Sequence, residues 1–190
     1  MIRDDAFYEA ENEARRYYYY VDMQGRLFTE QTLPKNIATC LKGEKFLDFF
    51  FRQVRPNPAG GDYAWLSPCG KESNFIDAAD TAIVFTELER GEGGASLIWG
   101  GTQRVAFEPE RLRVSEDGRL YHLIETKRGG VAPCLVRASV ALVLAEGMEL
   151  GEESGATAGT VEWEGRRVSL QWLDETCDGP RRPSGPRGRS

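Results

Sequence analysis

The side chain best suited to covalent chemistry is Cys69, in the segment Ser-Pro-Cys-Gly-Lys at residues 67–71. A cysteine in a turn beside a lysine can lose its proton readily, and the thiolate is the nucleophilic form of the side chain. Such a nucleophile needs a base, and His122 is the only imidazole in the chain. Nothing in the sequence brings these two residues together. The small and cyclic residues of the segment therefore favour a turn that fixes the backbone, and a Cys69–His122 catalytic pair is the less favoured interpretation.

Two further groups of residues could bind an anion or move a proton. Arg55-Pro56-Asn57 follows a segment with helical periodicity and could position an anion. The same residue types also end helices, because an arginine there offsets the negative end of the helix dipole. Asp22 and Glu30 flank a predicted hairpin and could pair as carboxylates, although acids at strand edges are commonly just solvated. Each group therefore has a structural interpretation beside the functional one.

Neither a phosphate-binding loop nor a base-stacking surface is indicated. The glycines of segment 91–94 are not followed by Lys-Ser or Lys-Thr, which a phosphate-binding loop requires. The tyrosines at 17–20, beside Arg15 and Arg16, could stack on bases. Aromatic residues that face the core from alternate sides of a strand explain them more simply. No group of residues supports an enzyme, and the sequence leaves the question of activity open.

The four cysteines do not form a metal site. They stand far apart without a Cys-x-x-Cys pair, and the chain has one histidine. Zinc sites usually draw their ligands in pairs from short loops, so we predict no metal and no cofactor. Scattered single cysteines fit a reducing compartment, where they serve as small buried apolar residues. They are Cys40, Cys69, Cys134 and Cys177.

The charge is divided between an acidic body and a basic end. The chain has 190 residues with 24 basic and 30 acidic side chains, and residues 1–178 hold 20 of the basic ones and all of the acidic ones. No stretch approaches the roughly 20 apolar residues of a membrane-spanning helix, so no span is predicted. An acidic body repels a phosphate backbone. Nucleic acid is therefore not expected as a partner except through the tail 179–190, with Arg181, Arg182, Arg187 and Arg189.

The elements that would position these residues begin with a hairpin at 17–29, YYYYVDMQGRLFT. Strand-favouring tyrosines precede Asp-Met-Gln-Gly, whose glycine can take the positive φ of a tight hairpin turn. Segments 117–121 and 164–168 repeat the glycine-arginine step. The repetition suggests two similar halves, 17–95 and 96–178, although such turns also recur by chance in β-rich chains.

The pattern of expected strands and helices along the chain predicts an α+β fold, mostly antiparallel β-sheet built from hairpins with one or two packed helices. A helix is expected at 44–54, where aromatic and aliphatic residues recur at helical spacing, and it ends at the prolines of 55–58. Segment 131–144 fits either a strand or a buried helix. The predicted organisation is a polar lead-in at 1–16, one domain at 17–178 and the basic tail at 179–190. Strands are predicted at 63–66, 81–88, 96–99, 104–107, 112–114, 119–124, 161–163 and 166–173, with a turn at 67–70 and a loop at 89–94.

Several ordered motifs resemble a small uncharacterised eukaryotic family whose human member is known as the open reading frame 82 protein of chromosome 8. They are YYYYVDMQGRLF, FFFRQVRPN, LSPCGKESNF, AIVFTEL, FEPERL and GRLYH, within about residues 15–173. A fainter similarity, in the D-x-x-G-R-x-F hairpin, the following helix and the AIVF strand, links the chain to a bacterial domain family of unknown function with a compact α+β fold. The resemblance implies no activity. It marks ten positions for a shared structural or binding role: Asp22, Gly25, Arg55, Pro56, Asn57, Ser67, Cys69, Gly70, Asn74 and His122.

The resemblance also implies a mitochondrial setting, because animal members of that family carry presequences. The first thirteen residues include five acids and show neither a secretory signal nor a presequence, so a cytoplasmic location is the alternative. We expect a non-enzymatic interaction protein, an accessory or structural subunit of a larger mitochondrial assembly with protein partners. The alternative is a small-molecule-binding protein or a cysteine-dependent enzyme that uses the Ser-Pro-Cys-Gly turn.

Overall fold

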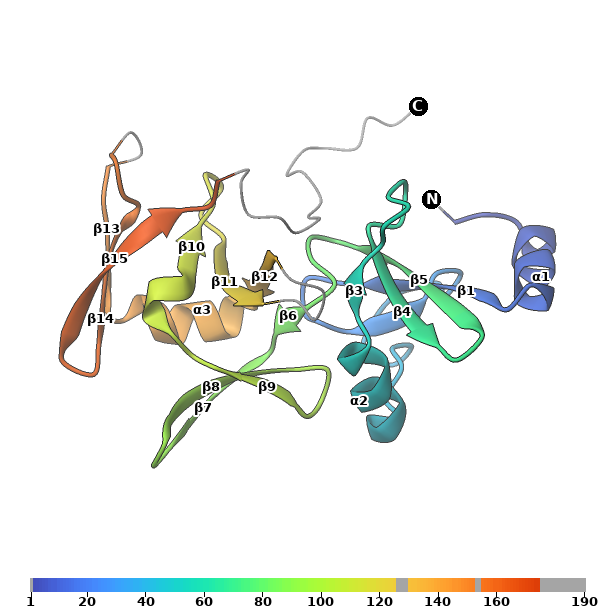
Figure 1. Cartoon of the computed structure of the whole chain (residues 1–190), viewed down its shortest axis with the longest axis horizontal. Coiled ribbons are helices and arrows are strands. Elements are labelled where there is room, and N and C mark those ends of the chain that lie inside the picture. The colour runs from blue at the N-terminus through green and yellow to red at the C-terminus, as the bar shows by residue number, and fades with distance from the viewer. Residues whose placement is uncertain (1, 126–129, 153–154, 175–190) are drawn as a thin grey trace.

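The computed structural model describes residues 2–125, 130–152 and 155–174. Within these residues the chain forms three α-helices, one short 3-10 helix and fifteen strands in three sheets (Figure 1). The predicted α+β class is confirmed. No helix in the described ranges is long and apolar enough to cross a bilayer. The predicted tail 179–190, with its four arginines, and Cys177 lie outside the described residues. The helices are α1 (Asp5–Glu13), α2 (Glu44–Arg52) and α3 (Ala138–Ala145).

The first sheet has five strands in the order β2-β1-β5-β4-β3. β1 and β2 form the predicted tyrosine hairpin, in which Gly25 has a φ of +75°. β1 also pairs in parallel with β5. β5 was not predicted, because buried polar residues, Asn74 and Asp77, interrupt its apolar pattern. The strands are β1 (Arg16–Val21), β2 (Leu27–Thr29), β3 (Arg55–Pro56), β4 (Trp65–Cys69) and β5 (Glu72–Ala78).

The predicted turn at 67–70 is wrong in its position. Residues 67–69 continue β4, and the turn consists of Gly70 and Lys71, since Cys69 lies opposite Glu72 in β5. Gly70 has a φ of +58°, which suits the first position of a two-residue hairpin turn. Pro68 lies opposite Ser73 of β5 on one side of β4. On the other side β3 pairs only with Trp65 and Leu66, so no strand faces Pro68 there and its missing N–H breaks no ladder on that side.

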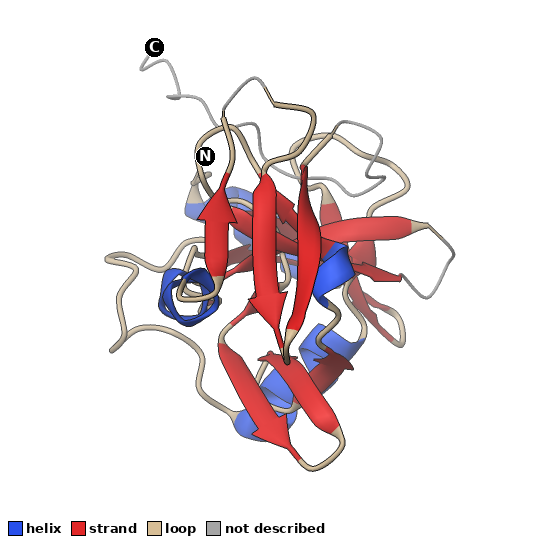
Figure 2. Cartoon of the chain, turned by 90° about the vertical axis from the view of Figure 1, so that its left-hand side faces the viewer, coloured by secondary structure: helices blue, strands red, loops and turns tan. Residues whose placement is uncertain are grey.

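The second sheet has seven strands in the order β13-β14-β15-β10-β11-β12-β6. Figure 2 shows its outer end, with β13, β14 and β15 side by side toward the viewer. Segment 131–144, which fitted a strand or a helix, contains both: β12 is followed at once by α3. The strands are β6 (Val84–Phe85), β10 (Leu112–Val114), β11 (Leu120–Glu125), β12 (Val131–Val136), β13 (Met148–Leu150), β14 (Gly159–Trp163) and β15 (Arg166–Trp172).

The two sheets share a strand order. The first runs β2-β1-β5-β4-β3, and five neighbouring strands of the second run β11-β10-β15-β14-β13. In both, the first strand of a hairpin pairs in parallel with the last of three later antiparallel strands. These parallel pairs are β1 with β5 and β10 with β15. Their opening turns also agree, because Gly25 N–H donates to the Asp22 carbonyl and Gly118 N–H to the Ser115 carbonyl, each at 2.9 Å. An origin by duplication stays a prediction.

A third sheet joins β7 (Glu87–Gly91), β8 (Gly94–Trp99) and β9 (Gln103–Ala106). The predicted strand 81–88 is divided at Thr86, because β6 pairs with β12 whereas β7 pairs with β8. The predicted loop at 89–94 is wrong. Its residues belong to β7 and β8, and only Glu92 and Gly93 form the turn between them, because Gly91 and Gly94 pair across the ladder.

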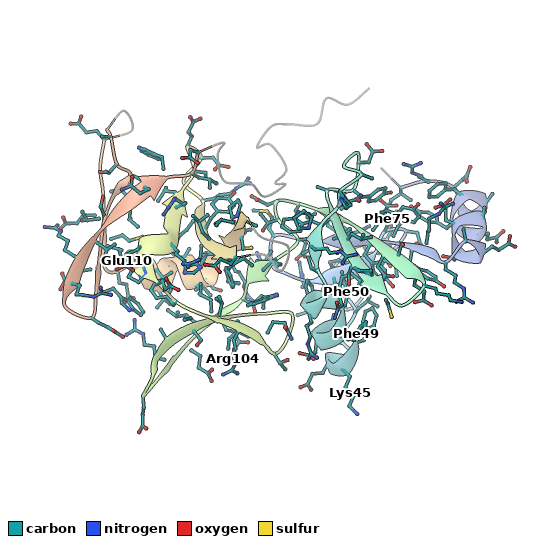
Figure 3. All side chains as sticks on the ribbon, in the orientation of Figure 1. Lys45, Phe49, Phe50, Phe75, Arg104 and Glu110 are labelled. Carbon is teal, nitrogen blue, oxygen red and sulfur yellow. The ribbon has the colours of Figure 1, made fainter. Side chains whose placement is uncertain are left out.

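Two apolar cores lie under the sheets. One gathers around Phe50, Trp65 and Ile76 of the first sheet and α2, and the other around residues of the second sheet such as Phe85. Trp99 packs against both cores, so the halves are joined by shared contacts. The predicted helix 44–54 is confirmed as α2 (Figure 3).

Candidate functional sites

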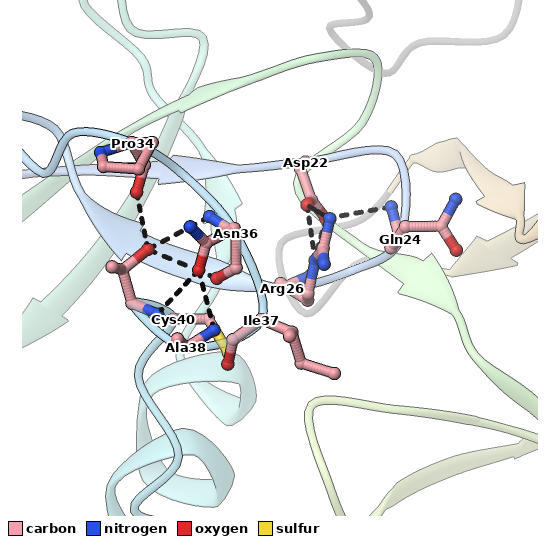
Figure 4. A network of polar contacts seen from close by, with 9 residues as sticks. Asp22, Gln24, Arg26, Pro34, Asn36, Ile37, Ala38 and Cys40 are labelled. Atoms are coloured by element: carbon pink, nitrogen blue, oxygen red, sulfur yellow. Dashed lines mark hydrogen bonds and ion pairs between the residues drawn. The ribbon is translucent and has the colours of Figure 1, made fainter.

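Asp22 and Gly25 build the first hairpin turn. The Asp22 carboxylate accepts hydrogen bonds from the backbone N–H groups of Gln24 and Arg26, each at 2.9 Å, and from Arg26 Nε at 2.7 Å (Figure 4). Gly25 packs against β6, since a Cβ there would lie 2.9 Å from Thr86 Cγ2. The structure therefore uses both residues to close the turn and to seat it.

Glu30, which was considered as a partner of Asp22, binds other residues instead. Its buried carboxylate accepts hydrogen bonds from Tyr8 Oη at 2.7 Å and from Tyr63 Oη at 2.9 and 3.0 Å. Burial first, and then the neighbouring Glu30 carboxylate, raise the pKa of the Tyr63 phenol. This cluster attaches α1 and the loop before β4 to the end of β2.

The Arg55-Pro56-Asn57 segment is divided between a strand and a loop. Arg55 and Pro56 form β3. The Asn57 amide donates to the carbonyls of Tyr63 at 2.8 Å and Gly60 at 3.3 Å, which closes the loop that follows. Arg55 Nε is buried and has no acceptor among the described residues. These contacts do not bring the three residues together into an anion site.

Ser67 and Asn74 hold elements together inside the first sheet. Ser67 Oγ donates to the Phe50 carbonyl of α2 at 2.7 Å, and Asn74 Nδ2 donates to the Ser67 carbonyl at 2.6 Å. Both side chains are buried. Cys69, half-buried at the end of β4, precedes the Gly70 turn. The polar residues of this motif thus connect α2, β4 and β5.

His122 lies in β11 of the second sheet and is 0% exposed. Its ring is close to those of Phe85 and Phe107, and its Nε2 accepts the Glu108 N–H at 3.1 Å. Burial, followed by the positive charge of Arg111, lowers the pKa of His122 to about 4. None of its described contacts involves Cys69, which belongs to the other sheet. The imidazole is therefore a neutral core residue.

Of the described cysteines, only Cys134 belongs to an apolar core. Cys134 is fully buried in β12, and burial raises the pKa of its thiol. Cys40 and Cys69 are half-buried and, like Cys134, unbridged. No group of three or more histidine, cysteine, aspartate or glutamate side chains in the described ranges could hold a metal ion.

The structure forms an apolar groove of about 550 Å³ that was not predicted from the sequence. We use this name for the surface lined by α3, β13 and the turns of the β1–β2 and β10–β11 hairpins. Among the described residues that line it, Arg119 alone is charged, and it pairs with Asp80 at 2.6 Å and Asp117 at 3.0 Å. Leu142 and Leu150 line the groove and are each 71% exposed. The groove is suited to apolar contact.

A second hollow, the arginine-lined cavity, has a volume of about 480 Å³. Residues of α2, β4, β8, β9, β11 and β12 line it, so both halves contribute. Its deeper lining is apolar and includes Phe51, Trp65 and Ile83, which are buried. Its charged lining residues are Arg52, Arg104, Arg111, Glu108 and Glu125. The cavity combines an apolar interior with guanidinium groups.

Only one of these two places left a trace in the sequence. The helix beside the groove, ASVALVLA at Ala138–Ala145, has no polar face, and a surface helix normally has one. Such a composition marks either a fully buried helix or a helix that a partner covers. The cavity left no local signal, because its lining residues are spread from Phe51 to Ala132.

Comparison with known proteins places this architecture in a family. Two bacterial crystal structures are similar, both described as DUF1285 family proteins. The one from Shewanella baltica OS155 is 11% identical with a TM-score of 0.48, over 68% of this chain and 91% of that chain. The one from Silicibacter pomeroyi DSS-3 is 12% identical with a TM-score of 0.47, over 83% of each chain. The sequence matches the family described as Domain of unknown function (DUF4505) over residues 8–173, and the chain therefore belongs to the DUF4505 family.

Proposed function

We propose that this protein is a non-enzymatic interaction protein, an accessory subunit of a larger assembly, which holds an amphipathic helix of a partner protein in the apolar groove. The observation that carries the proposal is α3, a helix whose residues are all apolar except Ser139 and which lies half open beside that groove. Of its eight residues, Val140 and Leu144 are buried, whereas Leu142 and Val143 are 71% and 48% exposed. Exposed apolar patches of this kind mark interaction surfaces.

The shape of the groove favours a helix as the occupant. Ala138, Ala141 and Ala145 line it at a spacing of three and four residues, so one face of α3 presents small side chains. Small residues let a second helix approach closely, and a helix in a groove is a recurrent mode of recognition. A strand is less suitable, because the edge strand β13 has only three residues to pair with.

Charge suggests the flanks of the partner helix. Glu116 and Glu146 are exposed and lie beside the lining residues in the sequence. Residues 1–178 as a whole carry ten more acidic than basic side chains. A helix with an apolar stripe bordered by lysine or arginine would therefore complement this surface. The resemblance to animal proteins with presequences supports a mitochondrial location for the assembly.

The test is a pair of matched substitutions at exposed leucines. Leu142→Glu places a carboxylate in the groove, whereas Leu33→Glu changes a leucine that is 72% exposed, against 71% for Leu142, and does not line the groove. A photo-crosslinking amino acid at Leu142 should attach to an apolar helical segment of one partner in a native extract. Leu142→Glu should abolish co-purification of that partner, and Leu33→Glu should retain it.

Two results would contradict the proposal. One is equal co-purification of the partner by both leucine variants. The other is a crosslink from position 142 to a second copy of this chain, since that would make the groove a dimer interface. Circular dichroism of both variants should match the unsubstituted protein, because both leucines are exposed.

A further inference from the structure

We infer that the arginine-lined cavity binds an organic acid, a carboxylate joined to an apolar body. This site lies between α2, the β8–β9 hairpin and β11, on lining residues that the apolar groove does not share. It is therefore independent of the proposed partner helix. Its volume, about 480 Å³, falls within the range of about 300–1,000 Å³ that is usual for small-molecule sites.

The interior of the cavity can accept an apolar body. Phe51 and Trp65 are buried at 4% and 2% exposure, and Ile83 and Ala132 complete an apolar wall beneath them. Trp99 adds a second indole from β8. Aromatic and aliphatic walls with a few polar groups are typical of ligand pockets.

The unsatisfied polar groups around the cavity are donors. The indole N–H groups of Trp65 and Trp99 are buried, and neither has an acceptor among the described residues. His122, whose Nε2 accepts the N–H of the lining residue Glu108, has a second ring nitrogen without a described partner. An unmade hydrogen bond in a buried place is costly, so an entering oxygen acceptor would be favoured. These buried donors therefore lack a hydrogen-bond acceptor.

The arginines at the cavity differ in how firmly they are held. Arg111 binds two carboxylates, Glu108 at 2.9 Å and Glu125 at 3.1 Å, so both lining acids are paired although its single charge offsets only one of them. Arg104 makes one described ion pair, to Glu89 at 3.0 Å, and both side chains are more than half exposed. Because an exposed pair contributes little and a guanidinium has five donors, Arg104 can engage a ligand carboxylate. Arg104 belongs to β9 and is labelled in Figure 3.

The wall that carries Arg104 is braced against α2. The Asp48 carboxylate of α2 binds Arg52, Thr102 and Gln103, the last at 2.5 Å. Gly100 allows the close approach, since a Cβ there would lie 2.5 Å from Phe51. These contacts hold α2 and the β8–β9 turn together, so the cavity is preformed and a ligand need not order it.

The experiment is a titration of the full chain, labelled with nitrogen-15, in which the indole N–H signals are followed by NMR. The probes are 3-phenylpropionate, which has an aromatic body, and octanoate, which has an acyl body, each up to about 10 mM. The signals of Trp65 and Trp99 should shift, and those of Trp163 and Trp172, which do not line the cavity, should stay. The acid whose shifts saturate at the lower concentration identifies the body that fits.

Two controls examine the carboxylate and the arginine. The amide 3-phenylpropionamide should bind about tenfold more weakly than the acid, because it cannot form the charge-assisted pair. Arg104→Gln should weaken binding of the acid by about tenfold. Arg166→Gln is the matched control, because Arg166 forms a similar exposed pair with Glu110 at 3.2 Å away from the cavity, and it should change the affinity less than about twofold.

Five results would overturn the inference. Four of them are no shift of the Trp65 or Trp99 signals with either acid, larger shifts at Trp163 or Trp172, equal affinity for the amide, and equal effects of Arg104→Gln and Arg166→Gln. Tighter binding of the amine 3-phenylpropylamine than of the acid would also overturn it, because the lining glutamates would then be the dominant charges. Since Arg104 and Arg166 are both exposed, both variants should fold.

Discussion

The imidazole of His122 is held neutral by its surroundings. It is enclosed in the second core, and burial lowers its pKa to about 4. An unfolded chain would bind a proton there near pH 6.5. Between these two pH values the unfolded state holds more protons than the folded state, so stability falls as the pH falls.

This linkage predicts a specific effect of His122→Gln. In the unsubstituted protein, the free energy of unfolding should drop by roughly 1–2 kcal/mol from about pH 7 to about pH 5 on account of this group, within a total on the order of 3 kcal/mol by about pH 4. Glutamine can still accept the Glu108 N–H but does not titrate, so the variant should lose that much less stability over the same interval. Urea unfolding at each pH measures the difference, and parallel curves would show that His122 does not contribute.

The hairpin turns show how one local conformation can have different consequences. Gly25, Gly118 and Gly165 have φ values of +75°, +76° and +73°. A Cβ at Gly25 would lie 2.9 Å from Thr86 and 3.3 Å from Val84, whereas nothing lies within 4 Å of a Cβ at Gly118 or Gly165. An alanine would therefore strain the backbone at all three positions, whereas it would meet neighbouring atoms only at Gly25.

We therefore expect Gly118→Ala to destabilise the protein by roughly 1–2 kcal/mol, the cost of a left-handed residue with a side chain. Gly25→Ala should cost a further 1–3 kcal/mol or so, because the methyl group must displace β6. Chemical denaturation of both variants measures the difference, and Gly165→Ala serves as a second reference. Equal losses would show that the first hairpin does not pack on β6 in solution.

The two halves are also linked by a buried ion pair. Asp80, which follows β5, accepts hydrogen bonds from Arg119 at 2.6 Å and from Tyr121 Oη at 2.7 Å in the β10–β11 hairpin. Although burial opposes the charge of Arg119, the hydrogen bond to Asp80 keeps the pKa of the guanidinium raised. Asp80 is 3% exposed, whereas the Arg119 side chain is 34% exposed, so it is the carboxylate of the pair that is shielded from water.

Asp80→Ala should lower the free energy of unfolding by about 3 kcal/mol, because it leaves the buried Tyr121 hydroxyl without its acceptor and Arg119 with Asp117 as its only described carboxylate partner. Asp117→Ala is the control, since Asp117 pairs with the same arginine at the surface and should cost less than about 1 kcal/mol. Urea unfolding measures both values. A similar loss in the two variants would mean that the buried pair does not join the halves.

Local elements could be predicted because neighbouring residues determine them. The tyrosine hairpin needs strand-forming residues and a glycine with positive φ, and α2 needs apolar residues at helical spacing. Both signals are visible within about ten residues. β5 was not found in this way, because buried polar residues, Asn74 and Asp77, interrupt its apolar pattern, and the partner that satisfies Asn74, Ser67, is known only from the fold.

The sequence by itself determined the tyrosine hairpin, the main helix, the α+β class and the family, since these depend on turn chemistry and periodicity within short windows. Only the tertiary structure decided what the marked residues do. It shows Asp22, Ser67, Asn74 and His122 in turns and buried contacts, and it assembles the groove and the cavity from residues distant in the chain. The physical reason is that parallel pairing and the burial of polar groups depend on partners that no local pattern specifies.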